Sequence, residues 1–93
     1  MSQVSTFYRY PYITISVNTP IARETHRISV QFTTLELRSL INPHGEAERF
    51  KDKIFHELLR YEGYEYARDM AIEAQQAYLR AVEQANEIWD KLD

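Results

Sequence analysis

The chain has little of what many functional motifs require. Among its 93 residues there are no cysteines, two glycines and three prolines. The absence of cysteine excludes a disulfide framework and a thiolate metal site, and it fits a protein of the cell interior. No apolar run approaches the roughly 20 residues that cross a bilayer. Residues 2–17 are polar and tyrosine-rich, unlike a signal peptide. We therefore expect a cytoplasmic protein with no membrane partner.

Positive charge is also not concentrated in the way that a strong binder of duplex DNA requires. The formal net charge is −3. Residues 1–49 hold five arginines and four glutamates, whereas residues 50–93 hold six basic and ten acidic residues. Neither half therefore has a strong positive field. The length and a hydrophobic content of 44% favour a single folded domain over residues 1–93.

What the chain does have is a strand phrase that occurs twice. The letters ISVNT begin at Ile15, and ISVQFT begin at Ile28. Apolar and polar residues alternate around each phrase, which is typical of a strand with one buried face. The first strand is predicted to begin at Phe7, with Phe7 on the buried face and the neighbouring tyrosines on the other. Pro20 favours a loop between the phrases, so residues 7–33 are predicted to form an antiparallel β-hairpin.

The remainder of the chain has helical periodicity. Thr33 and Thr34 offer a helix N-cap, with Glu36 near the third helical position. A short helix and an amphipathic helix are predicted within residues 34–62, separated by the breaker letters NPHG. A long C-terminal helix is predicted over residues 64–92, and the glycine before it either ends the second helix or lies within one long helix. The fold class is therefore α+β, with an N-terminal hairpin, a short helix and two longer helices.

The predicted C-terminal helix carries an alanine-rich heptad seam. Its apolar residues recur at alternating spacings of four and three: Ala67, Ala71, Ala74, Tyr78, Ala81, Ala85, Ile88 and Leu92. Small residues let two helix backbones approach closely. A helix over residues 64–92 would be about 43 Å long, which exceeds a compact domain of this size. We therefore expect a homodimer through the seam, with Ile72, Leu79 and Val82 as a second apolar line.

Few residues are candidates for chemistry. The histidines His26, His44 and His56 are scattered, and none stands in a glycine-framed nucleophile elbow or another catalytic pattern. We therefore expect no enzymatic activity and no cofactor.

A stripe of carboxylates lies at the start of the predicted C-terminal helix. Glu62, Glu65, Asp69 and Glu73 follow spacings of three, four and four, which place them on one helix face. Such an acidic face could hold a divalent cation or imitate a phosphate backbone. We favour a solvated face near a helix N-terminus, because like charges at this spacing cost little on a surface, and we predict no metal site.

The tyrosines are the most informative residues for function. Three of them alternate along the predicted first strand, and the same face continues across the hairpin. This polar, almost uncharged surface suits a protein interface, and its rings could also stack on bases. A cross-strand ladder that only supports the sheet is the structural alternative. The predicted partner-binding residues are Tyr8, Tyr10, Tyr12, Arg27, Ser29 and Gln31.

Residues 26–62 resemble a ribbon-helix-helix unit, with a strand of alternating polar residues, a short helix, a turn and an amphipathic helix. In that family, a dimer forms a two-stranded ribbon whose outward residues read bases in the major groove. The resemblance implies that Arg27, Ser29 and Gln31 would be the readers. The chain departs from the family pattern because a preceding hairpin arm competes for the ribbon pairing, and because glutamates open the second helix. Its long acidic extension has no family counterpart of fixed form, although antitoxin members often end in acidic tails.

These observations favour a non-enzymatic binding protein, namely a small adaptor or inhibitor that occludes a surface of a larger protein or nucleoprotein complex. Compact acidic proteins without cysteine are familiar among inhibitors from phages and mobile elements. The expected partner is a macromolecular protein, and self-association is also expected. The alternative is a ribbon-helix-helix-like DNA-binding regulator or antitoxin, for which DNA would be the partner.

Overall fold

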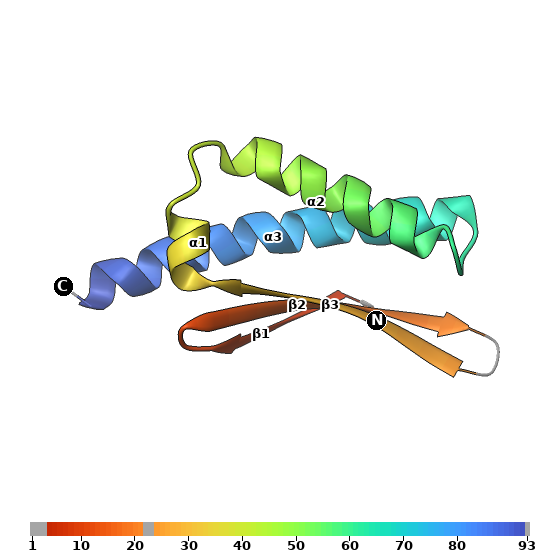
Figure 1. Cartoon of the computed structure of the whole chain (residues 1–93), viewed down its shortest axis with the longest axis horizontal. Coiled ribbons are helices and arrows are strands. Elements are labelled where there is room, and N and C mark those ends of the chain that lie inside the picture. Colours follow the sequence, from red (N-terminus) through yellow and green to blue (C-terminus); the bar gives the residue numbers. More distant parts are fainter. Residues whose placement is uncertain (1–3, 22–23, 93) are drawn as a thin grey trace.

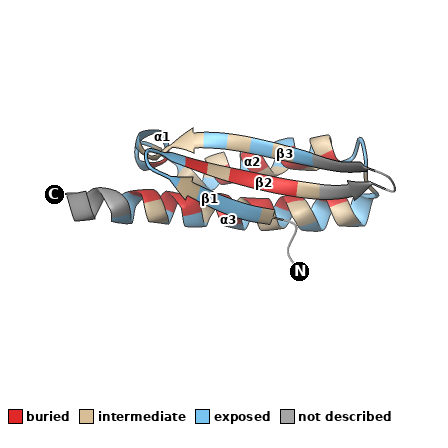
Figure 2. Cartoon of the chain, turned by 90° about the horizontal axis from the view of Figure 1, so that it is seen from below, coloured by how far each residue is buried: buried red, intermediate tan, exposed pale blue. Residues whose placement is uncertain are grey.

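The computed structural model describes residues 4–21 and 24–92, with side chains described over residues 4–18 and 27–87. Three antiparallel strands are followed by one short and two longer helices, which confirms the predicted α+β class (Figure 1). The molecule is elongated, with extents of 48 × 24 × 18 Å. In the described part of the chain, the helices lie on one side of the sheet and leave the other side open (Figure 2).

The sheet is a meander in the order β1 (Val4–Arg9), β2 (Tyr12–Ile21) and β3 (Glu24–Thr33). The two repeated phrases form β2 and β3, which pair antiparallel as predicted. The predicted loop at Pro20 is wrong, because β2 continues through this residue, which pairs with Thr25. The first arm of the predicted hairpin is not one strand, because a two-residue turn at Tyr10 and Pro11, joined by a cis peptide bond, folds it back on itself. The predicted hairpin therefore becomes a three-stranded sheet.

The turn before β2 reverses the face assignment of the first strand. Tyr8 pairs with Ile13 across the turn. Directly paired residues share a sheet face, so Tyr8 lies on the inner face, toward the helices. Its neighbour Phe7 lies on the outer face and is 64% exposed. The predicted faces of these two residues are wrong, because the prediction assumes one uninterrupted strand across Pro11.

The core begins on the inner face of the central strand. Ile13, Ile15 and Val17 of β2 are fully buried, and their alternation with polar residues is what the sequence pattern predicts. The inner-face residues of β3 are only partly buried and pack against this core: Ile28, Val30 and Phe32. The sheet is therefore covered best at its centre.

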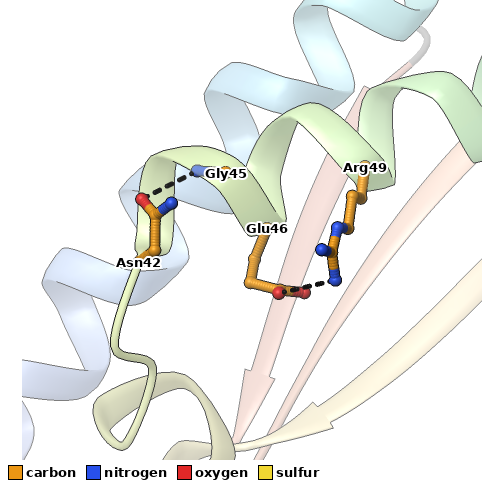
Figure 3. A network of polar contacts seen from close by, with 4 residues as sticks. All are labelled: Asn42, Gly45, Glu46 and Arg49. Atoms are coloured by element: carbon orange, nitrogen blue, oxygen red, sulfur yellow. Dashed lines mark hydrogen bonds and ion pairs between the residues drawn. The ribbon is translucent and has the colours of Figure 1, made fainter.

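Side-chain caps fix where the first two helices begin. Thr33 accepts a hydrogen bond from the Glu36 N–H at 3.1 Å, which confirms the predicted cap of α1 (Thr34–Arg38). Asn42 likewise accepts from the Gly45 N–H at 3.1 Å and opens α2 (Pro43–Leu58), as Figure 3 shows. A Cβ atom at Gly45 would lie 2.5 Å from the Asn42 side chain, so a larger residue there would displace the capping amide.

The second of these helices is also held by an ion pair in its first two turns. Glu46 and Arg49 approach to 3.3 Å on the exposed surface of α2 (Figure 3). An exposed pair of this kind contributes little to stability. Packing of α2 through Ala47, Phe50 and Ile54, all buried, therefore decides its position.

The longest helix, α3 (Tyr64–Leu92), runs along the sheet and lies nearer to the strands than α2 does (Figure 1). A cluster of aromatic rings fills the space between the layers. The Phe32 ring centroid lies 5.7 Å from that of Phe50 in α2 and 5.2 Å from that of Tyr78 in α3. Gly63 lies outside the helices, since α2 ends at Leu58 and α3 begins at Tyr64.

The alanine seam of α3 lies in the protein's own core. Every seam residue whose side chain is described is at most 5% exposed in the single chain: Ala67, Ala71, Ala74, Tyr78, Ala81 and Ala85. The side chains of Ile88 and Leu92 lie outside the described residues. In the same chain α3 packs against α2, α1 and the sheet, and this packing buries the seam, so the prediction that a second copy covers it is corrected.

Within the described part of the chain, none of the helices combines the length and the apolarity needed to span a bilayer.

Candidate functional site

The outer face of the sheet gathers side chains from all three strands. We define it by the residues that point away from the helices: Ser5, Phe7, Arg9, Tyr12, Thr14, Ser16, Asn18, Arg27, Ser29, Gln31 and Thr33. The strand registers place these residues in rows that cross the sheet. Figure 2 views the molecule from this side, with the strands in front of the helices.

A row of three serines crosses the middle of the outer face. Ser5 pairs with Ser16, and Ser16 pairs with Ser29. The hydroxyl groups of Ser16 and Ser29 lie 3.1 Å apart and share a hydrogen bond. Because serine is short, the centre of this face is low, and even Ser16 on the central strand is only 8% exposed.

Taller side chains stand at the end of the outer face nearest the β1–β2 turn. Phe7 is 64% exposed and Tyr12 is 43% exposed. Tyr10, in the turn itself, is also exposed. These rings therefore project beyond the serine row and offer apolar contact area to a partner.

Charge on the outer face has one sign. Arg9 and Arg27 are exposed, and the described side chains of this face include no carboxylate. The Nε of Arg27 donates to the Asn18 side-chain oxygen at 3.2 Å, which ties this guanidinium to the neighbouring strand. In a chain of net charge −3, the outer face is thus a locally positive surface.

Four of the six predicted partner-binding residues lie together on the outer face: Tyr12, Arg27, Ser29 and Gln31. Tyr8 is on the inner face and packs against the core, and Tyr10 occupies the turn. The sequence prediction missed Phe7 and Arg9. The signal that could have found them is Pro11, because a turn there reverses which residues of the first strand face outward.

The carboxylates of the predicted acidic face do not converge. Glu62 precedes α3, whereas Glu65 and Asp69 are exposed on it, and Asp69 accepts a hydrogen bond from Arg68 at 3.2 Å. Among the described residues, no group of three or more acidic, histidine or cysteine side chains is placed to hold a metal ion.

Two of these carboxylates act on a tyrosine beneath the sheet. Burial raises the pKa of Tyr66, and the nearby charges of Glu62 and Glu73 raise it further. The Tyr66 hydroxyl donates to the Asn18 backbone carbonyl at 3.3 Å. This contact ties the start of α3 to β2, which is a structural role.

A groove of about 210 Å³ lies between α2 and α3. Its lining residues are Lys51, Asp52, Phe55, Tyr64, Arg68, Ala71 and Ile72. Phe55 and Tyr64 meet edge to face in it, with ring centroids 5.5 Å apart. These two rings therefore fill part of the groove.

The histidines are distributed as the sequence suggests. His56 is exposed on α2, and its Nδ1 lies 2.7 Å from the Asp52 carbonyl of the preceding turn. His44 is exposed in the first turn of the same helix. The side chain of His26 lies outside the described residues. The two described imidazoles are thus both exposed to solvent.

Comparison with models of protein families, with curated proteins and with solved structures finds no match to the chain. Its function has to be inferred from the surfaces described above.

Proposed function

We propose that the protein is a non-enzymatic binding protein, an adaptor or inhibitor that covers a surface of a larger protein or nucleoprotein complex with its outer face. One observation carries the proposal. Within the described residues, the helices leave the outer face of the sheet uncovered, and it combines exposed aromatic rings with arginines around a low serine row. Aromatic residues and arginine are enriched in protein interfaces, whereas a face needed only for solubility is rich in mixed charges.

The proposed binding mode divides the face into two parts. Phe7 and Tyr12 would enter pockets of the partner and supply most of the binding energy, as buried aromatic residues do at interface centres. The serine row would let the partner's surface come close to the strands, with hydroxyl groups available as donors and acceptors. Arg9 and Arg27 would favour an acidic partner surface and speed association.

We assign this activity to the cytoplasm, in keeping with a chain that has no cysteine. The small size and acidic balance resemble those of inhibitors from phages and mobile elements, and we propose that class as the biological setting.

The outer face is less suited to the ribbon-helix-helix alternative. A B-DNA major groove is about 12 Å wide and admits a two-stranded ribbon. Here β3 already pairs with β2, which pairs with β1, so Arg27, Ser29 and Gln31 lie at one side of a three-stranded sheet. We therefore favour a protein partner over duplex DNA.

The proposal is tested by removing the exposed rings and following a captured partner. The tagged wild-type chain is used to isolate partners from cells of its source, and the affinity of the recovered partner is then measured with purified variants. Phe7→Ser combined with Tyr12→Ser should weaken binding at least tenfold, because both anchors are lost. Ile41→Ser is the matched control, since Ile41 is an apolar side chain exposed at 101% away from the sheet.

Two outcomes contradict the proposal. Equal affinity of the double variant and the control would show that the outer face is not the binding surface. A gel shift with duplex DNA that weakens steeply with salt, without capture of a protein, would favour the DNA-binding alternative.

A further inference from the structure

The direction of backbone hydrogen bonds in β3 shows what its free side offers. The Thr34 N–H donates to the Pro11 carbonyl at 2.8 Å, which continues the β2–β3 ladder by one step. Only every second residue of an antiparallel strand bonds to a given neighbour. The even-numbered residues of β3 therefore direct their N–H and C=O groups toward β2. The residues of β3 that direct these groups to the free side are Thr25, Arg27, Ser29, Gln31 and Thr33.

This free side lacks the features that usually protect an edge strand. Within the described residues, β3 pairs with β2 only. From Arg27 to Thr33 the sequence RISVQFT contains no proline, glycine or lysine, and its one charge stands at the end. Natural edge strands are commonly blocked by such residues, by bulges or by short length. β3, with ten residues, is longer than the six-residue strand at the other edge of the sheet.

The apolar row beneath this edge is incompletely covered. Ile28, Val30 and Phe32 are only partly buried, although they belong to the same inner face as the fully buried residues of β2. Figures 1 and 2 show the reason, because α3 runs along the β1 side of the sheet while α2, which lies behind β3, is farther from the strands. An added strand beside β3 would cover this row as well as satisfy the free backbone groups.

We infer that the β3 edge pairs antiparallel with the β3 edge of a second copy, joining two sheets into one of six strands. In a register centred on Val30, this residue lies opposite itself and Ile28 lies opposite Phe32 of the second copy. On the outer face, Ser29 lies opposite Gln31 and Arg27 opposite Thr33. Apolar residues thus meet apolar residues, polar meet polar, and the two arginines stay at opposite ends.

This self-complementarity favours a second copy of the chain over a strand from another protein. The side chains of residues 27–33 on the two copies match one another in type, so the pairing needs no other sequence. The two-fold axis is perpendicular to the sheet, so both outer faces point to the same side and form one larger surface. The inference does not depend on what that surface binds.

Single cysteines test the register, because the chain has none of its own. Val30→Cys places two sulfurs across a non-hydrogen-bonded pair with a Cα separation of about 4.5 Å, which suits a disulfide. Ile28→Cys is the matched control in the same half-buried row. In the proposed dimer, position 28 of one copy would lie four residues along the strand from position 28 of the other, roughly 13 Å away. Mild oxidation should cross-link most of the Val30→Cys chains and few of the Ile28→Cys chains.

A proline at the edge tests the pairing itself by light scattering after size exclusion. Ser29→Pro removes an N–H that points away from β2, so it removes no ladder bond within the chain. Ser29→Ala removes the same hydroxyl and keeps the N–H. At tens of micromolar, wild type and Ser29→Ala should have the mass of a dimer and Ser29→Pro that of a monomer with an unchanged circular dichroism spectrum.

A monomeric wild type at 100 micromolar, or a dimer that survives Ser29→Pro, overturns the inference. So does equal cross-linking of the two cysteine variants. Should Ser29→Pro fail to fold, the cysteine pair decides the question on its own. A monomer that instead accepts a strand from another protein would also refute the second copy.

Discussion

The two faces of the sheet are built by the same three strands and have opposite environments. On β2, Ile13 and Ile15 are fully buried under the helices, whereas Thr14 between them faces the open side. The sheet therefore makes its apolar contacts with the helices through its inner face only. The comparison teaches that the outer face can carry rings and arginines at little cost in stability, since few packed contacts depend on its residues.

The largest effect that tests this comparison is expected on the buried side, in the alanine seam. Ala74 is 0% exposed, and Ala74→Glu would place a charge and extra bulk in the core. We expect a loss of about 4 kcal/mol or more, which would unfold a domain of ordinary stability. Circular dichroism and urea unfolding measure it. Gln76→Glu, at an exposed position of the same helix, should stay within about 0.5 kcal/mol of wild type.

A folded Ala74→Glu protein of near-wild-type stability would show that the seam is not in the core of the single chain. If it were folded but monomeric where wild type is dimeric, the seam would be an interface between copies after all.

The second effect separates two neighbours in β1. Tyr8 packs against the core, whereas Phe7 lies on the outer face. Tyr8→Ala should therefore lower the free energy of unfolding by about 1–3 kcal/mol, less than a fully buried aromatic residue would. Phe7→Ala should change it by about 0.5 kcal/mol or less. The reverse order, measured by urea unfolding of both variants, would return the first strand to the faces predicted from an uninterrupted alternation.

The sequence predicts the parts of the fold that local pattern determines. Alternation locates β2 and β3, and Thr33 with Glu36 locates the start of α1, as the observed cap confirms. The position of Pro11 is different, because proline is compatible with both an edge strand and a turn. Only the pairing of Tyr8 with Ile13 decides between them, and the alternation of residue types is compatible with either arrangement.

The alanine seam illustrates the same limit at the level of packing. Its spacing correctly predicts that a helix backbone approaches α3 closely, but a periodic pattern does not specify whose helix it is. The length argument for a second copy fails because the chain itself is elongated. Strands of ten residues reach roughly 33 Å, so the sheet and α2 together accompany most of α3.

For the candidate site, the sequence identifies the part that lies on unbroken strands. Tyr12, Arg27 and Ser29 follow the alternation of β2 and β3 and reach the outer face together. The serine row could not be recognised, because it needs the registers of both strand pairs at once. Ser5 lies 11 residues from its pairing partner Ser16, and nothing in the local sequence links the two.

The smallest expected effect concerns a titratable group on the buried side, Tyr78. Burial raises the pKa of its phenol above the usual value near 10, and the charges of Glu46 and Glu36 raise it further. Above pH 10, the unfolded chain loses this proton while the folded chain keeps it, so the unfolded state binds fewer protons and stability falls as pH rises. The contribution of this group is fully present below pH 10 and is lost as pH rises through the folded pKa. Melting temperatures at pH 9 and pH 11 should therefore fall further for wild type than for Tyr78→Phe, which keeps the ring contacts with Phe32 and Phe50 but cannot ionise. Equal losses for the two proteins would mean that the Tyr78 hydroxyl reaches solvent in the folded state and that the buried side is less closed than its apolar residues indicate.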